Sequence, residues 1–179
     1  MLQITIPEIE MYDELHEEFI EIPETVLRLE HSLVSVSKWE AKWKKPFLDQ
    51  KPKTDAETRD YVRCMTLTQN VDPKVYLGLG HDQMELINQY INTEQTATWF
   101  SKDAKPPSRE IVTSELLYYI MCAYQIPWEA QKWHLSRLLT LIRIASIKNQ
   151  PEKKMPKNAV LSRNRALNAA RRKKHHTKG

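Results

Sequence analysis

The sequence predicts a mainly α protein of the α+β type, with a body of about five helices, a small N-terminal antiparallel β element and a basic C-terminal helical arm. Three observations support this prediction. Apolar and polar residues alternate over about residues 1–30, the apolar spacing becomes helical after Ser32, and the charge changes sign after Pro151. We therefore expect an acidic helical domain over residues 1–150 and a basic arm over residues 151–179.

The N-terminal segment has the pattern of short strands. Leu2–Ile6 alternates apolar and polar residues and ends at Pro7. Three more runs follow: Glu10–Asp13, Glu18–Ile22 and Thr25–Glu30. The polar residues Glu14–Glu17 predict a turn between the first two of these runs, and the whole predicts a small antiparallel sheet. An acidic helix from Tyr12 to Ile20 is the alternative interpretation.

From Ser32 onward the pattern predicts helices. Ser32 is suited to cap a helix that Pro46 ends, and Thr54–Glu57 has the spacing of a capping box that begins a second helix. Asp72–Pro73 predicts a short helical turn, which Gly78 and Gly80 close.

Three longer helices are expected after the glycines. One runs from about Asp82 to Phe100, with Trp99 on its inner side, and another begins at Ser108–Ile111. Pro127 is placed to open the longest helix, Trp128–Asn149, whose wide apolar stripe predicts that it is the central core helix.

Charge is divided unevenly along the chain. The first 32 residues contain nine acidic side chains against Arg28 alone. Residues 151–179 carry a net charge of +9, so the other 150 residues carry −5 of the total of +4. This division permits head-to-tail self-association or capture of a charged partner, while the alternative is two solvated surfaces.

The composition argues against catalysis. The chain has three glycines, of which Gly78 and Gly80 are close together and Gly179 is terminal. It therefore lacks the glycines that phosphate-binding loops and nucleophile elbows need. The histidines never lie four apart, no Cys-x-x-Cys occurs, and adjacency of Glu30, His31 and Ser32 does not make a catalytic relay. We expect no enzymatic activity, no metal and no cofactor. Cys64 and Cys122 are expected to be buried, reduced thiols.

No segment predicts a membrane anchor or a secretion signal. The longest apolar stretch, Leu116–Ala123, is far shorter than the ~20 residues that cross a bilayer. The N-terminus lacks the basic residues of a signal peptide. The protein is expected to remain in the cytoplasm and to have no membrane partner.

Four tryptophans are the candidate protein-binding residues. Trp39 and Trp43 are spaced to share one helical face, and Trp128 and Trp133 stand near the start of the predicted long helix. Core packing is the alternative role, because tryptophan buries a large area. Those that are exposed are expected to anchor a partner protein.

The arm is a candidate site for charged partners. Lys157–Lys174 favours a helix by composition, although its apolar residues are too small and few to fold it alone. The candidate charge partners are Arg163, Arg165, Arg171, Arg172, Lys173 and Lys174. They could bind an acidic protein surface, including that of a neighbouring copy, or the phosphates of a nucleic acid. The arm lacks the aromatic residues on which single-stranded bases stack.

Several segments resemble a tailed-bacteriophage protein encoded among the virion morphogenesis genes. They are Leu29–Glu40 (LEHSLVSVSKWE), Lys42–Leu48 (KWKKPFL), Ile126–Ile142 (IPWEAQKWHLSRLLTLI) and Arg163–Arg172 (RNRALNAARR). The likeness covers most of the chain from Glu10 onward and is nearest to a tail assembly chaperone. Such chaperones lack a universal motif, so no residue role is carried over.

The resemblance implies a helical protein that coats the tape-measure protein, or binds another tail protein, in the host cytoplasm until tail-tube subunits replace it. Two alternatives stay open. One is a DNA-associated protein that uses the basic arm, and the other is a permanent minor component of the virion, such as a connector or tail protein.

Overall fold

The computed structural model describes residues 1–13, 17–98, 100, 111–149 and 157–176. The chain forms two units, a body over Met1–Ser146 and a second unit over Ile147–Gly179. The predicted mainly α fold with a small N-terminal antiparallel element is confirmed. The predicted boundary near residue 150 lies close to the division between the two units.

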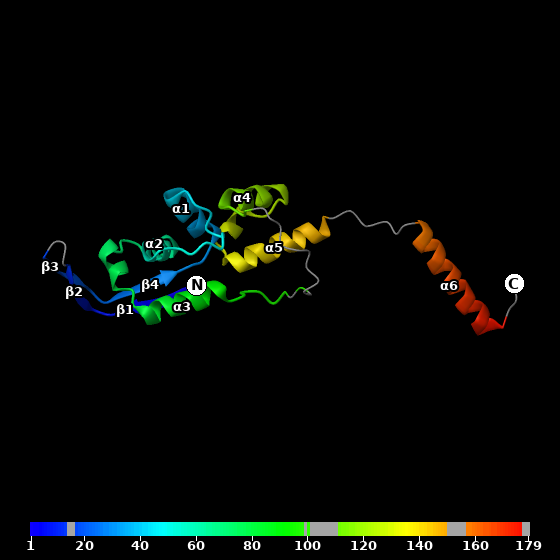
Figure 1. Ribbon diagram of the computed structural model, residues 1–179, viewed down its shortest axis with the longest axis horizontal. Helices are drawn as coiled ribbons and strands as arrows, with labels where there is room; N and C mark the ends of the chain where they lie inside the picture. Colours follow the sequence, from blue (N-terminus) through cyan, green and yellow to red (C-terminus); the bar gives the residue numbers. More distant parts are fainter. Residues whose placement is uncertain (14–16, 99, 101–110, 150–156, 177–179) are drawn as a thin grey trace. The chain divides into compact units, whose positions relative to one another are not determined.

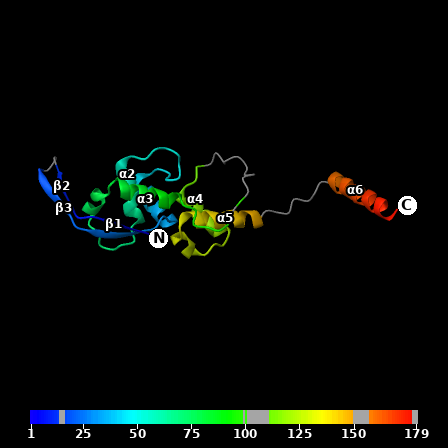
Figure 2. The same ribbon diagram turned by 90° about the horizontal axis from the view of Figure 1, so that it is seen from below.

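The N-terminal element is one long antiparallel hairpin in two parts, which we call the ribbon. The inner part pairs β1 (Leu2–Ile6) with β4 (Thr25–Leu29), and the outer part pairs β2 (Ile9–Asp13) with β3 (Glu18–Ile22). The register is the same in both parts, since Ile6 faces Thr25 and Ile9 faces Ile22. The outer part projects from one end of the body (Figures 1 and 2). The strand interpretation of this segment is therefore confirmed, and the alternative acidic helix is wrong.

The apolar face of the ribbon changes sides where the prolines interrupt it. Residues two apart on a strand lie on the same face. In the inner part the buried residues of the first strand are the even-numbered Ile4 and Ile6, whereas in the outer part the odd-numbered Ile9 and Met11 share the face of buried Ile22. Ile6 and Ile22 nevertheless meet at Gly78, where an added Cβ would lie 3.1 Å from Ile6 and 3.3 Å from Ile22. The ribbon must twist strongly at this step for both side chains to reach the same neighbour. A larger residue at position 78 would make Ile6 and Ile22 shift by a few tenths of an ångström.

Two capped helices follow the ribbon as predicted. Helix α1 (Leu33–Trp43) begins after Ser32, and helix α2 (Asp55–Met65) begins after Thr54. In both caps the hydroxyl accepts a backbone N–H, and the side chain three residues later accepts the N–H of the cap. After α2, the N–H of Leu67 donates to the carbonyl of Arg28 at 2.7 Å, which ties the end of α2 to β4.

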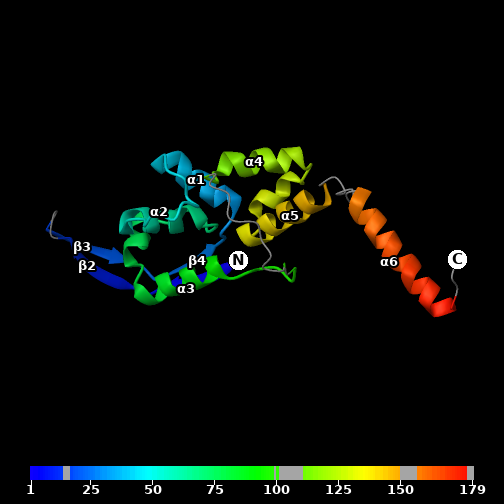
Figure 3. The same cartoon turned by 45° about the vertical axis from the view of Figure 1, so that its right-hand side comes forward.

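The next two elements lie against the ribbon. The 3₁₀ turn η1 (Pro73–Gly78) starts where Asp72–Pro73 predicts it, and α3 (His81–Asn92) lies beside β1 (Figures 1 and 3). The predicted extension of α3 to Phe100 is wrong. The helix ends at Asn92, and Trp99 lies outside the described residues.

The remaining helices of the body start later than the sequence predicts. Helix α4 (Ser114–Ala123) is capped by Thr113, and residues 108–110 lie outside the described residues. The predicted long helix is two elements, the 3₁₀ turn η2 (Trp128–Lys132) and α5 (Leu135–Lys148). The break has a tertiary cause. The N–H of Leu135 donates to the carbonyl of His31 at 2.8 Å, so the backbone before α5 pairs with the turn after β4.

The core lies between the inner ribbon and the helices. Its largest fully buried side chains are Trp39, Ile6, Ile22, Leu27, Leu29, Leu33, Met65, Ile87, Met121, Leu138, Val36 and Val62. Helix α1 contacts both α2 and α4, and is therefore the central helix. Helix α5 buries Leu135 and Leu138 only, so the prediction that it is the central core helix is wrong. Cys64 is half-buried and Cys122 is exposed, which corrects the prediction that both thiols are buried.

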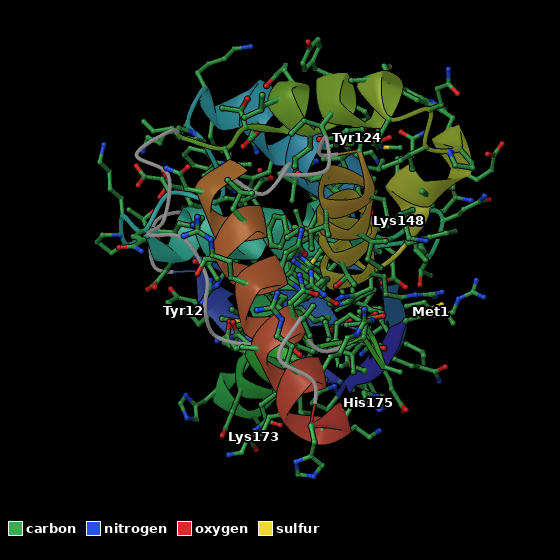
Figure 4. All side chains as sticks on the ribbon, turned by 90° about the vertical axis from the view of Figure 1, so that its right-hand side faces the viewer. Met1, Tyr12, Tyr124, Lys148, Lys173 and His175 are labelled. Carbon is green, nitrogen blue, oxygen red and sulfur yellow. The ribbon has the colours of Figure 1, made fainter. Side chains whose placement is uncertain are left out.

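The second unit contains the predicted helical arm. Helix α6 covers Lys157–His175, and every side chain from Leu161 to His176 is exposed. Figure 4 labels Lys173 and His175 near the C-terminal end of this helix.

Candidate protein-binding surfaces

The first pair of predicted tryptophans joins α1 to α2. Trp39 is 1% exposed, and its Nε1–H donates to the carbonyl of Glu57 at 2.8 Å. Trp43 is half-buried, and its Nε1–H donates to Asp60 Oδ2 at 2.8 Å. Trp39 is therefore a core residue, and Trp43 has its polar atom engaged within the body. The Trp39 ring is enclosed by the core, whereas the half-buried Trp43 ring lines a groove of about 450 Å³ together with Tyr76 and Leu77.

Asp60 holds three donors on the surface of this helix pair. Its Oδ1 lies 2.6 Å from Lys42 Nζ and 2.9 Å from Arg63 Nε, in addition to the bond from Trp43. Burial alone would raise the pKa of Asp60, but the hydrogen bonds from Lys42 and Trp43 and the charge of Arg63 outweigh it and lower the pKa. The carboxylate thus fixes α1 against α2.

A second polar group, at the turn between β4 and α1, is buried. His31 Nδ1 lies 2.5 Å from the hydroxyl of Tyr61, which also lies 3.2 Å from Ser35 Oγ. The His31 ring meets the His134 ring edge-on, with centroids 5.2 Å apart. His134 Nδ1 in turn lies 2.9 Å from Ser136 Oγ in the first turn of α5. The group joins the starts of α1 and α5 to α2.

Glu30 is not part of a catalytic relay with His31. Its carboxylate accepts the hydroxyl of Tyr90 at 2.8 Å and lies 3.1 Å from the N-terminal ammonium group. His31 has a different partner, the Tyr61 hydroxyl. Within the described residues, no group of three or more His, Cys, Asp or Glu side chains is placed to hold a metal ion.

Acidification is expected to destabilise the body through its two buried histidines. Burial and the neighbouring His134 lower the pKa of His31 to about 4, and burial lowers the pKa of His134. The folded state therefore binds fewer protons than the unfolded state below pH 6.5. The contribution of these two histidines to the free energy of unfolding should be constant above about pH 7 and fall by up to about 3 kcal/mol as the pH drops to about 4.

Urea unfolding at a series of pH values checks this expectation. His31→Asn removes one titrating group, and its loss of stability between neutral pH and pH 4–5 should be smaller than that of the unchanged protein. His81→Asn, on the exposed first residue of α3, is the matched control. Identical pH profiles for His31→Asn and the unchanged protein would contradict the assignment.

The second pair of predicted tryptophans is exposed around η2. Trp128 is 52% exposed and stacks on Tyr118, with ring centroids 5.2 Å apart. Trp133 is 37% exposed, and the guanidinium of Arg137 lies 5.1 Å from its ring centroid. Both rings are held in fixed orientations by one neighbour while they remain open to solvent. Rigid, partly exposed aromatic rings are typical of protein-binding anchors.

A groove continues from Trp133 along α5. It has a volume of about 320 Å³, and the segment 95–98 forms its other side. Trp133, Leu141 and Ile144 give it apolar walls. Leu141 and Ile144 are three residues apart and share one side of α5, whereas Trp133 precedes the helix. A hydrogen bond of 3.0 Å from the N–H of Gln95 to Ser136 Oγ holds the segment on α5. We call this groove with Trp128 and Trp133 the η2–α5 surface.

A second groove lies across the same segment. Its volume is about 450 Å³, and Phe100, Leu139 and Arg143 line it. The guanidinium of Arg143 stands 4.0 Å from the Phe100 ring centroid. Helix α5 therefore has recesses on both sides of the 94–98 segment. No sequence signal predicts them, because they depend on where a segment distant in sequence comes to lie.

The six predicted charge partners all lie on α6. Their side chains are exposed, and they share the helix with no acidic residue between Lys157 and His175. They belong to the second unit, whereas the four candidate tryptophans belong to the body.

Among the helices described, none is long and apolar enough to cross a membrane. Comparison with protein-family models, with curated proteins and with solved structures found no match to this chain.

Proposed function

We propose that this protein is a phage tail assembly chaperone, which binds the tape-measure protein in the host cytoplasm during tail morphogenesis. The observation that supports the proposal is the η2–α5 surface, where the exposed Trp133 lines the groove beside Leu141 and Ile144 and a second exposed tryptophan, Trp128, stands at the start of η2. The phage family is proposed for this protein because residues 29–40, 42–48, 126–142 and 163–172 resemble a phage morphogenesis protein.

The chemistry of the surface suits a helical client. A long tape-measure helix has apolar stripes that need cover before the tail tube forms, and such stripes dock in grooves through side chains spaced three and four residues apart. Trp128 and Trp133 would contact the apolar stripe, while Arg137, on the groove wall, would face its polar flank. Binding of this kind requires no catalytic group.

Leu141→Asp is expected to abolish this activity. Co-expression with the tape-measure protein of the same phage should keep that protein soluble, and the substitution should lower its soluble yield about tenfold or more, since a charge in an apolar contact costs about 2 kcal/mol or more. Leu86→Asp is the matched control. It places the same change at a 50% exposed leucine in the middle of α3 and should leave the yield unchanged.

The direct readout is a purified complex of the two proteins. The proposal fails if the tape-measure protein is equally insoluble with and without this chain and no complex is recovered. It also fails if Leu141→Asp and Leu86→Asp have the same effect, because binding would then not use the η2–α5 surface. Circular dichroism of both variants confirms that each is folded.

A DNA-associated protein is the second candidate, and the uniformly basic, exposed α6 favours it. Phosphate contacts by six cations would give duplex binding that weakens steeply with salt. Fluorescence anisotropy with a short duplex at low and physiological salt distinguishes the candidates. A chaperone should show little affinity at physiological salt, whereas a DNA-binding protein should lose its affinity when Arg171 and Arg172 become glutamate.

A permanent virion component is the third candidate. Mass spectrometry of purified particles separates it from a chaperone, which leaves before the tail is complete.

A further inference from the structure

The outer ribbon has an exposed face that combines acidic and aromatic side chains. Opposite residues of an antiparallel pair project from the same face, so Glu10 and Glu21 share a face with Tyr12 and Phe19. All four side chains are exposed, Phe19 by 67%. The two rings pack across the strands with centroids 5.0 Å apart. We call these four residues the acidic aromatic face.

This face is unfavourable when it is left uncovered. Glu10 and Glu21 are directly opposite each other, and like charges at opposite positions destabilise a strand pair. Tyr12 and Phe19 keep large apolar rings in water. A cation placed between the carboxylates would remove the repulsion, and a guanidinium or ammonium group would also be attracted to the ring faces. The complementary partner is therefore a cationic segment with some apolar surface.

Helix α6 has this chemistry. It has no acidic residue, and its exposed cations include Arg163, Arg171 and Lys174. One side of the helix holds Ala166, Leu167 and Ala170, with Arg163 and Lys174 at either end of this apolar stretch. The apolar stretch would contact the rings while the two cations reach the carboxylates.

We propose that the acidic aromatic face binds α6 of a second copy of this chain, so that copies join head to tail. Charge complementarity supports this partner, and so does the layout of the body. The outer ribbon projects from one end of the body and α5, which leads to the arm, lies at the other (Figures 1 and 2). A contact between two different surfaces of identical copies leaves one of each surface free at the ends, so it can extend into a chain or close into a ring. The interaction is independent of the client that the η2–α5 surface binds.

Sedimentation velocity over a range of protein concentrations tests the proposal. The unchanged protein should form dimers and longer species at low salt, and raising the ionic strength from about 50 to about 300 mM should weaken association severalfold. The ribbon variant Glu10→Lys/Glu21→Lys and the arm variant Arg171→Glu/Arg172→Glu should each weaken it about tenfold or more, equal to about 1.4 kcal/mol. Glu85→Lys/Glu129→Lys changes the net charge as the ribbon variant does, at exposed positions on α3 and η2, and should associate like the unchanged protein.

Mixing the two variants gives the decisive result. The ribbon variant keeps its basic arm and the arm variant keeps its acidic ribbon, so an equimolar mixture should form a mixed complex that neither variant forms alone. Two outcomes overturn the proposal. One is a monomer at all concentrations at low salt, as expected if the arm binds its own ribbon or a nucleic acid. The other is association that the charge reversals leave unchanged, which would place the contact elsewhere.

Discussion

Replacing Trp39 by alanine is expected to lower the free energy of unfolding by about 3–5 kcal/mol, the range for a large aromatic side chain removed from a core. The indole is 1% exposed and packs against Trp43 and Phe47, with centroid distances of 6.2 and 5.2 Å. Its loss would leave a cavity between α1 and α2 and remove the hydrogen bond to the carbonyl of Glu57.

Chemical denaturation followed by far-ultraviolet circular dichroism measures this effect without relying on tryptophan fluorescence. Trp128→Ala is the matched control, since that ring is 52% exposed. It should change the free energy of unfolding by less than about 1 kcal/mol. Equal losses in the two variants would show that Trp39 is not the residue that holds α1 against α2.

Glu40→Ala is expected to cost about 2–4 kcal/mol, because it leaves two backbone N–H groups without their acceptor. Oε1 accepts the N–H of Phe47 and Oε2 accepts the N–H of Ser114, both at 2.7 Å. One buried carboxylate on α1 thereby holds the loop that follows this helix and the first residue of α4. Glu40→Gln keeps only one acceptor oxygen and should give an intermediate loss.

Thermal and urea unfolding of both Glu40 variants provide the measurement. Glu115→Ala, at an exposed position in the first turn of α4, is the control and should lose less than about 1 kcal/mol. If Glu40→Gln were as stable as the unchanged protein, one of the two N–H groups would have to find another acceptor, and the proposed double role of Glu40 would be wrong.

Local signals in the sequence predicted local structure well. Alternation predicted the strands, and the hydroxyl residues Ser32 and Thr54 predicted where α1 and α2 begin, because a capping box is complete within four residues. The end of α3 was missed because no glycine or proline follows Asn92 before Pro106. The polar run Thr93–Thr98 leaves the helix to lie on α5, where Gln95 bonds to Ser136.

The sequence pattern could not predict features that depend on contacts between residues far apart in the chain. The break before α5 exists because Leu135 pairs with the carbonyl of His31, about a hundred positions earlier. The same limit applies to the candidate site. The sequence made Trp39 and Trp133 equal candidates for protein binding. Only the fold shows that Trp39 is buried and that Trp133 lines a groove. Glu40 offered no signal, since its two donors are far apart in the chain.

The exchange of faces at Pro7 and Pro23 separates two tasks within a single hairpin. Proline has no N–H to give to a neighbouring strand, so the pairing is interrupted at this step, and the outer strands contribute mainly Ile22 to the core. The tip of the outer part of the ribbon can therefore vary in length and sequence. Residue pairs could be added or removed beyond the Met11–Ile20 pair, changing the reach and the charge of the tip without repacking the interior that Ile6, Ile22 and Leu27 fill.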